Sequence, residues 1–155
     1  MQIHVYERIT MGLTAVILVL ALIAIGGSVF IAGLRLPGPV MHVDPRRLRE
    51  TPPFDVPGLR EVGAGQYQAI MIAQTWSFTP AEIQVPAGAT VTFRVATADV
   101  THGFVIQGTD ANLTLIPGHV AEATARFPTP GTYLIVCHEY CGIGHQTMFA
   151  RVIVQ

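Results

Sequence analysis

The chain contains the stretch Thr90-Val91-Thr92-Phe93-Arg94-Val95, in which polar and apolar residues alternate without a break. Successive side chains of a β-strand point to opposite faces of the sheet. The two valines and the phenylalanine therefore share one face, and Thr92 and Arg94 lie on the other. This alternation predicts a half-buried strand over residues 90–97.

Short runs of the same kind recur through the C-terminal part of the chain. Turns that contain glycine or proline separate them, among them Pro86-Ala87-Gly88 and Pro130-Gly131. No helical period is present from residue 66 onward. Seven or eight short strands in roughly 90 residues predict an antiparallel β-sandwich. The expected strands are residues 66–74, 82–85, 90–97, 103–107, 112–116, 120–127, 132–136 and 148–154.

A long apolar segment precedes these strands. Residues 9–34 contain no charged side chain, and a helix of 26 residues at roughly 1.5 Å per residue is about 39 Å long, enough to cross a bilayer. A cleaved signal peptide is the alternative, but its apolar region usually has only about 7–15 residues, and no clear cleavage site follows here. We therefore expect a single, retained transmembrane helix within residues 1–36.

The segment between the helix and the strands is rich in proline. It excludes a long helix or a central strand, because proline has a restricted φ and lacks a backbone donor. We expect residues 37–60 to form an extended connector and residues 61–155 to form the all-β domain. The prolines are at positions 37, 39, 45, 52, 53 and 57.

The charge balance excludes some classes of function. All nine basic residues are arginine, ten residues are acidic, and the formal net charge is −1. Such a balance indicates neither nucleic-acid binding nor a polybasic patch for a membrane surface. The sequence also contains no recognisable nucleophile with a general acid–base partner.

Soft metal-binding side chains gather near the C-terminus. They lie in Cys137-His138-Glu139-Tyr140-Cys141-Gly142-Ile143-Gly144-His145-Gln146-Thr147-Met148, where two thiols, an imidazole and a thioether follow at intervals of four, four and three residues. Copper prefers sulfur and imidazole ligands, and a closing methionine is more typical of copper than of zinc. Two thiolates in one loop can bridge a pair of copper ions if a second imidazole is supplied. His102 is the obvious candidate.

Other interpretations of this cluster remain open from the residues alone. One thiolate with one imidazole and the thioether would suit a mononuclear electron-transfer copper. Two thiols and two imidazoles also make a plausible tetrahedral zinc set. Finally, two cysteines outside the cytoplasm could form a disulfide, which would destroy the metal site.

The loop and its surroundings resemble subunit II of cytochrome c oxidase, which carries a binuclear copper A site. The resemblance extends from roughly residue 66 to residue 155 and implies a cupredoxin-like Greek-key β-sandwich whose metal loop joins the last two strands. The short chain with one N-terminal apolar segment is most similar to the B-type haem–copper oxidases. Besides the loop, the matching motifs are Asp99-Val100-Thr101-His102, residues 108–112, Ile116-Pro117-Gly118 and Pro130-Gly131-Thr132-Tyr133.

The resemblance implies a role for each residue of the site. Two copper ions would be held by two bridging thiolates, two imidazoles, a weak axial thioether and a backbone carbonyl. These are supplied by Cys137 and Cys141, by His102 and His145, by Met148, and by Glu139. Some relatives also use the glutamate side chain to bind magnesium near subunit I. The B-type relatives lack that site, so a magnesium role for Glu139 is left open.

The resemblance also implies a function. The chain would accept electrons from cytochrome c and pass them to haem in subunit I, where oxygen is reduced and protons are pumped. Trp76, the only tryptophan, resembles the aromatic segment at which electrons arrive, although a buried core position is the alternative. A membrane-anchored copper carrier or copper chaperone outside an oxidase is the alternative function. The second cysteine and Glu139 argue against it.

The implied location is the plasma membrane of a prokaryote. The chain would cross the lipid once, with the copper domain on the extracytoplasmic side. The arginines indicate the opposite, because Arg8 precedes the apolar segment whereas Arg35, Arg46, Arg47 and Arg49 follow it. We follow the resemblance, because partner subunits can determine the orientation of a single short span.

Overall fold

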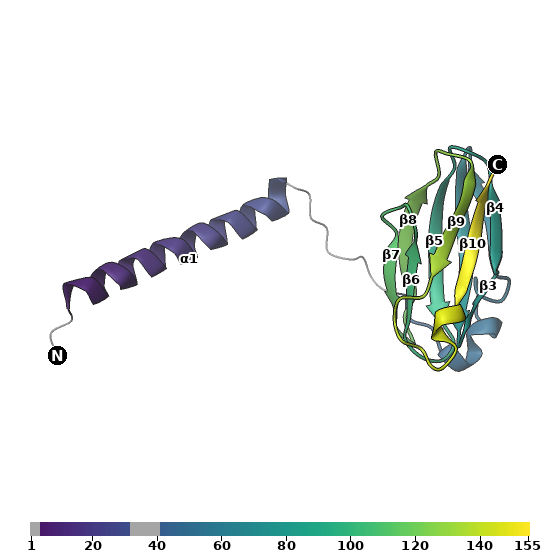
Figure 1. Ribbon diagram of the computed structural model, residues 1–155, viewed down its shortest axis with the longest axis horizontal. Helices are drawn as coiled ribbons and strands as arrows, with labels where there is room; N and C mark the ends of the chain where they lie inside the picture. The colour runs from purple at the N-terminus through teal and green to yellow at the C-terminus, as the bar shows by residue number, and fades with distance from the viewer. Residues whose placement is uncertain (1–3, 32–40) are drawn as a thin grey trace. The chain divides into compact units, whose positions relative to one another are not determined.

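The computed structural model describes residues 4–31 and 41–155, and the chain divides into a helical unit and a β-sandwich (Figure 1). Helix α1 spans Val5–Ile31, so it begins before the uncharged segment does. Its part Val5–Ser28 is long and apolar enough to cross a membrane. Residues 32–36 of the predicted N-terminal unit, and residues 37–40 of the predicted connector, lie outside the described residues.

The second unit is a sandwich of two five-stranded sheets, which confirms the expected all-β class (Figure 1). One sheet has the order β1 (Gly58–Gly63), β2 (Gln66–Gln74), β5 (Thr90–Thr97) and β8 (Ala121–Arg126), with β3 (Ser77–Thr79) paired to β2. The other has the order β4 (Glu82–Val85), β10 (Phe149–Val154), β9 (Gly131–Val136), β6 (His102–Ile106) and β7 (Asn112–Leu115).

The predicted strands agree closely with the observed ones. β2, β4 and β5 have the predicted bounds, and the other five predicted strands differ by one residue at one end (β7, β9 and β10) or at both ends (β6 and β8). β1 and β3 were not expected. Every residue of β1 is exposed or half-buried, so its sequence lacks the alternation that marks a buried face. β3 has only three residues, too few for a periodic pattern.

The expectation of an entirely antiparallel sandwich is wrong for two strand pairs. β2 pairs with β5 in parallel, and β4 pairs with β10 in parallel. Parallel neighbours need a long crossover rather than a tight turn. Between β2 and β5, the chain makes this crossover through the other sheet: it leaves the first sheet after β3, adds β4 to the second sheet, and returns to the first sheet as β5.

The core between the sheets follows from the alternation in β5. Val91, Phe93 and Val95 are fully buried, and Phe93 packs against Phe104 and Phe127 with ring centroids 5.6 and 6.3 Å apart. On the opposite face of β5, Arg94 forms an ion pair of 3.1 Å with Glu122 of β8. The two faces of this strand therefore differ as the sequence predicts.

The outer face of β2 is covered by the segment that precedes β1. Asp44 caps the 3-10 helix η1 (Pro45–Glu50): its carboxylate accepts a hydrogen bond of 3.0 Å from the Arg46 backbone. A second core cluster joins this segment to the sheet and consists of Val43, Leu48, Phe54, Ile70, Ile72, Ala96 and Val120. The described part of the predicted connector, from residue 41, is therefore folded onto the sandwich, and β1 begins before residue 61. The apolar side chains of this segment stabilise its packing on the sheet, because their burial removes apolar surface from water.

Candidate metal centre

The loop from Cys137 to Met148 joins β9 to β10 and is closed at its base by their pairing. Phe149 lies opposite Val136 in the antiparallel register, and the Cys137 backbone N–H donates to the Met148 carbonyl oxygen at 3.2 Å. A short 3-10 helix, η2 (His145–Thr147), shapes the second half of the loop. The first and last soft side chains of the motif are thus held side by side.

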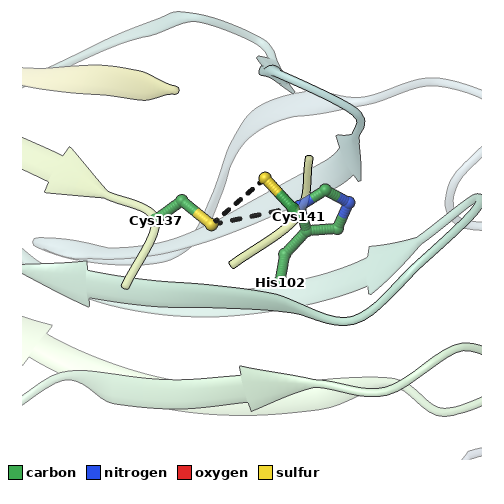
Figure 2. A group of neighbouring side chains, drawn as sticks. All are labelled: His102, Cys137 and Cys141. Atoms are coloured by element: carbon green, nitrogen blue, oxygen red, sulfur yellow. Dashed lines mark hydrogen bonds between the residues drawn. The ribbon is translucent and has the colours of Figure 1, made fainter. Parts of the chain in front are cut away.

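The two thiols are free, buried and close together (Figure 2). Their sulfur atoms are 3.9 Å apart. The disulfide considered for this pair is therefore not present in the structure. Instead, the other proposed donor groups of the site surround the two sulfurs.

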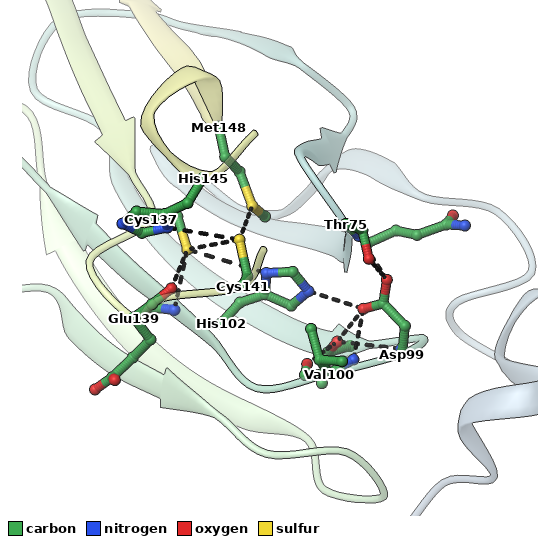
Figure 3. A network of polar contacts seen from close by, with 12 residues as sticks. Thr75, Asp99, Val100, His102, Cys137, Glu139, Cys141, His145 and Met148 are labelled. Carbon is green, nitrogen blue, oxygen red and sulfur yellow. Dashed lines mark hydrogen bonds and ion pairs between the residues drawn. The ribbon is translucent and has the colours of Figure 1, made fainter. Parts of the chain in front are cut away.

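Each sulfur has its own neighbours (Figure 3). Cys141 Sγ lies 3.5 Å from His145 Nδ1 and 3.6 Å from Met148 Sδ. Cys137 Sγ lies 3.2 Å from the carbonyl oxygen of Glu139, while the Glu139 side chain points away from the sulfurs (Figure 3). Three donors of different kinds, an imidazole nitrogen, a thioether sulfur and a carbonyl oxygen, thus surround the pair of sulfurs from within the loop itself.

His102 reaches the loop from a different strand. It opens β6, which pairs with β9, and its side chain is fully buried. His102 Nδ1 lies 4.0 Å from Cys137 Sγ, and the ligand atoms of His102, Cys137 and Cys141 all lie within 4.8 Å of one another. All six predicted site residues therefore meet at one end of the sandwich. Two sulfurs, two imidazoles, a thioether and a carbonyl form a donor set whose softness fits copper.

The imidazole of His102 is held by Asp99. The second ring nitrogen of His102, Nε2, lies 2.8 Å from Asp99 Oδ1. Burial raises the pKa of Asp99, but hydrogen bonds from Thr75, His102 and the Val100 backbone outweigh it and lower that pKa to about 2. The Asp99 carboxylate is therefore charged at neutral pH and available as an acceptor.

The thiol of Cys141 is in an apolar and crowded place. Burial raises its pKa, and the neighbouring Cys137 raises it further, whereas a hydrogen bond from the Trp76 backbone lowers it. Gly103 donates its backbone N–H to Cys137 Sγ at 3.4 Å. Each sulfur therefore has a backbone donor as a neighbour, and cysteine binds metal through this sulfur atom as the thiolate.

Trp76 lies on the surface beside this loop and not in the core. It is 50% exposed, and it occupies the two-residue turn between β2 and β3 with a φ of 68°. A non-glycine residue with positive φ costs of order 1–3 kcal/mol and persists where the surroundings impose it. The indole is close to the loop: a Cβ on Gly144 would lie 2.7 Å from Trp76 Cγ.

Gly103 has a similar steric role on the other side of the loop. A Cβ at this position would lie 2.5 Å from the His138 backbone nitrogen and 2.7 Å from that of Glu139. Only glycine lets the loop backbone approach β6 this closely. Sequence reasoning assigned no role to Gly103. The sequence also contained no sign that Thr75 contacts Asp99, because these residues belong to different strand ends.

Comparisons with known proteins find sequences similar to this chain. Residues 69–155 match the family described as cytochrome c oxidase subunit II, periplasmic domain. The chain is 34% identical over 154 residues to cytochrome c oxidase subunit 2 of Thermus thermophilus, which covers 97% of this chain and 92% of that relative.

Solved structures show the same likeness. A chain of a haem–copper terminal oxidase dimer has a TM-score of 0.69 and 30% identity, covering 97% of this chain and 99% of that chain. The periplasmic domain of cytochrome oxidase subunit II from Bradyrhizobium japonicum has a TM-score of 0.53 and 20% identity, covering 57% of this chain and 83% of that chain. This shared fold confirms the expected cupredoxin-like sandwich.

Proposed function

Because this chain belongs to the cytochrome c oxidase subunit II family, we propose that its sandwich holds a binuclear copper A centre. The chain is an electron-transfer subunit of a haem–copper oxidase complex, which is an oxidoreductase. In this proposal it accepts single electrons from a cytochrome c and delivers them to haem in subunit I. Oxygen reduction and proton pumping belong to subunit I.

The convergence of two thiols, two imidazoles, a thioether and a carbonyl carries this proposal. The sulfurs of Cys137 and Cys141, 3.9 Å apart, would bridge the two ions, and His102 and His145 would each bind one. Met148 would add a weak ligand to one ion and the Glu139 carbonyl to the other. When bound, the copper pair supplies one-electron redox chemistry, while the protein supplies binding, orientation and exclusion of water.

We also assign the chain to the B-type oxidases. Its described residues contain one helix that could span a membrane. His102 is followed by Gly103-Phe104, where A-type chains have serine and tryptophan. Glycine at position 103 allows the loop backbone to approach β6 closely, and a larger residue there would collide with the loop. This fit between Gly103 and the loop supports the assignment.

The surface beside the loop suits an electron donor. Three large apolar side chains of this region are exposed: Trp76 by 50%, Tyr140 by 77% and Ile143 by 87%. Exposed aromatic residues are typical of protein interfaces. Trp76 is therefore the proposed point at which electrons from cytochrome c arrive, since its indole packs against the metal-binding loop.

The arginines that follow the apolar segment do not contradict an extracytoplasmic sandwich. Three of the first four arginines after the apolar segment, Arg46, Arg47 and Arg49, lie in η1, and Leu48 of this helix packs on the sandwich. Folded domains are translocated largely regardless of their charge, so these arginines do not count as loop charges. We propose a single span in the lipid of a prokaryotic plasma membrane, with the sandwich on the extracytoplasmic side.

The copper-loaded full chain, purified in detergent, tests the proposed function. We expect two copper ions per chain, a purple colour and a seven-line hyperfine pattern in the electron paramagnetic resonance spectrum. That pattern arises when two copper nuclei share one unpaired electron. A four-line spectrum with one copper per chain would contradict the binuclear centre.

Replacing Met148 by leucine is expected to keep both copper ions but to change the reduction potential. The reason is that an axial thioether is a weak ligand, which adjusts the potential more than the affinity. Copper stoichiometry and redox titration of Met148→Leu measure the two effects separately. If Met148→Leu loses both copper ions, the thioether holds the site together and its assignment as a weak ligand is wrong.

A further inference from the structure

The two-residue turn between β2 and β3 contacts the metal centre from outside the ligand set. β2 and β5 are parallel and end at the same edge of the sheet, with Ala73 opposite Thr97. The residues that follow these ends, Thr75 and Asp99, therefore lie side by side. This placement brings a threonine of the turn within reach of the carboxylate that holds His102.

Each oxygen of the Asp99 carboxylate has its own set of partners (Figure 3). Oδ2 accepts hydrogen bonds from both the hydroxyl and the backbone N–H of Thr75, the latter at 2.6 Å. Oδ1 accepts from the Val100 backbone at 2.7 Å and faces His102 Nε2 at 2.8 Å. Thr97 Oγ1 also reaches Oδ1, at 3.3 Å.

This division of partners determines how the carboxylate is turned. With Oδ2 held by Thr75, Oδ1 is directed at the His102 ring, and the carboxylate cannot rotate without breaking several hydrogen bonds. An ionised carboxylate only accepts, so it selects the imidazole form that carries a proton on Nε2. That form leaves the lone pair of Nδ1 free, and Nδ1 is the atom that faces Cys137 Sγ.

We infer that Thr75 is a positioning residue of the metal centre: through Asp99 it orients the His102 ring and selects the tautomer whose Nδ1 can bind metal. The inference rests on the proposed copper function and deepens it. Mutation of a residue that supports a metal-binding histidine in this way typically lowers metal affinity or activity about 10–100-fold.

Thr75→Val tests this inference because valine keeps the size of the side chain and the backbone N–H but loses the hydroxyl. In the copper-loaded full chain we expect Thr75→Val to weaken copper binding about tenfold or more, measured by competition with a chelator. The hyperfine pattern should become less symmetric between the two copper ions. Thr75→Ser restores the hydroxyl and should restore both properties.

A readout on the metal-free chain separates positioning from general stabilisation. Nitrogen NMR of the His102 ring should show the Nε2–H tautomer in the wild type and a mixture of tautomers in Thr75→Val. Thr124→Val is the matched control, since its hydroxyl contacts Thr92 on the outer face of the sheet at 3.1 Å. It removes one threonine hydroxyl and should leave the tautomer and the copper affinity unchanged.

The outcomes are distinct. Wild-type copper affinity, an unchanged spectrum and a pure Nε2–H tautomer in Thr75→Val would overturn the inference. If Thr75→Val does not fold, Asp99→Asn tests the same link, because an amide can also donate to Nε2 and so favours the other tautomer. A wild-type chain that binds no copper pair would refute the proposed function instead, and the NMR result would still report on the role of Thr75.

Discussion

Replacing either Cys137 or Cys141 by serine is expected to abolish the binuclear copper centre. A serine oxygen is a hard donor and stays protonated at neutral pH, so it cannot replace a bridging thiolate. Both thiols are buried and their sulfurs are 3.9 Å apart, so both would bridge the same two ions of the proposed centre. Copper analysis should fall from two ions to one or none per chain, and the purple colour and seven-line spectrum should disappear.

A neighbouring loop residue provides the control for these variants. Gln146 is exposed and lies between the proposed ligands His145 and Met148. Gln146→Ala should keep two copper ions and an unchanged spectrum, which separates loss of a ligand from general damage to the loop. A Cys141→Ser or Cys137→Ser chain that still binds two ions with a delocalised electron would contradict the bridging role.

Replacing Trp76 by alanine is expected to slow electron transfer from cytochrome c while leaving the copper spectrum intact. A tryptophan at the centre of an interface typically contributes about 2 kcal/mol or more, which corresponds to a roughly 30-fold change in affinity. Trp76 is half-exposed beside the metal loop but supplies no ligand side chain. The measurement is the second-order rate of reduction of the copper-loaded chain by reduced cytochrome c.

The same experiment at several salt concentrations tests the nature of the contact. Residues 61–155 contain three arginines and six carboxylates, which make only a weak field when spread over the sandwich. We therefore expect a mild dependence on ionic strength. Val62→Ala, which truncates an exposed apolar side chain on β1, is the control and should leave the rate unchanged. A rate that falls by orders of magnitude with salt but is insensitive to Trp76→Ala would indicate electrostatic docking, with Trp76 uninvolved.

Local pattern alone was sufficient to predict most strands of the sandwich. Alternation at a period of two depends only on neighbouring residues, so β5 was predicted with its correct bounds and its buried face. The site loop could also be recognised in the sequence, because four of the proposed metal-ligating side chains lie within twelve residues. The spacing of ligands in one loop is a property of the chain itself, and the loop folds as a single connection between β9 and β10.

Tertiary structure decided what depends on segments that are far apart in the chain. Parallel pairing of β2 with β5 follows from the path of the chain through both sheets, which no local pattern records. That pairing places Thr75 beside Asp99, and so a hairpin turn comes to support His102. The folding of residues 41–57 onto β2 likewise depends on an apolar outer face that becomes available only once the sheet has formed.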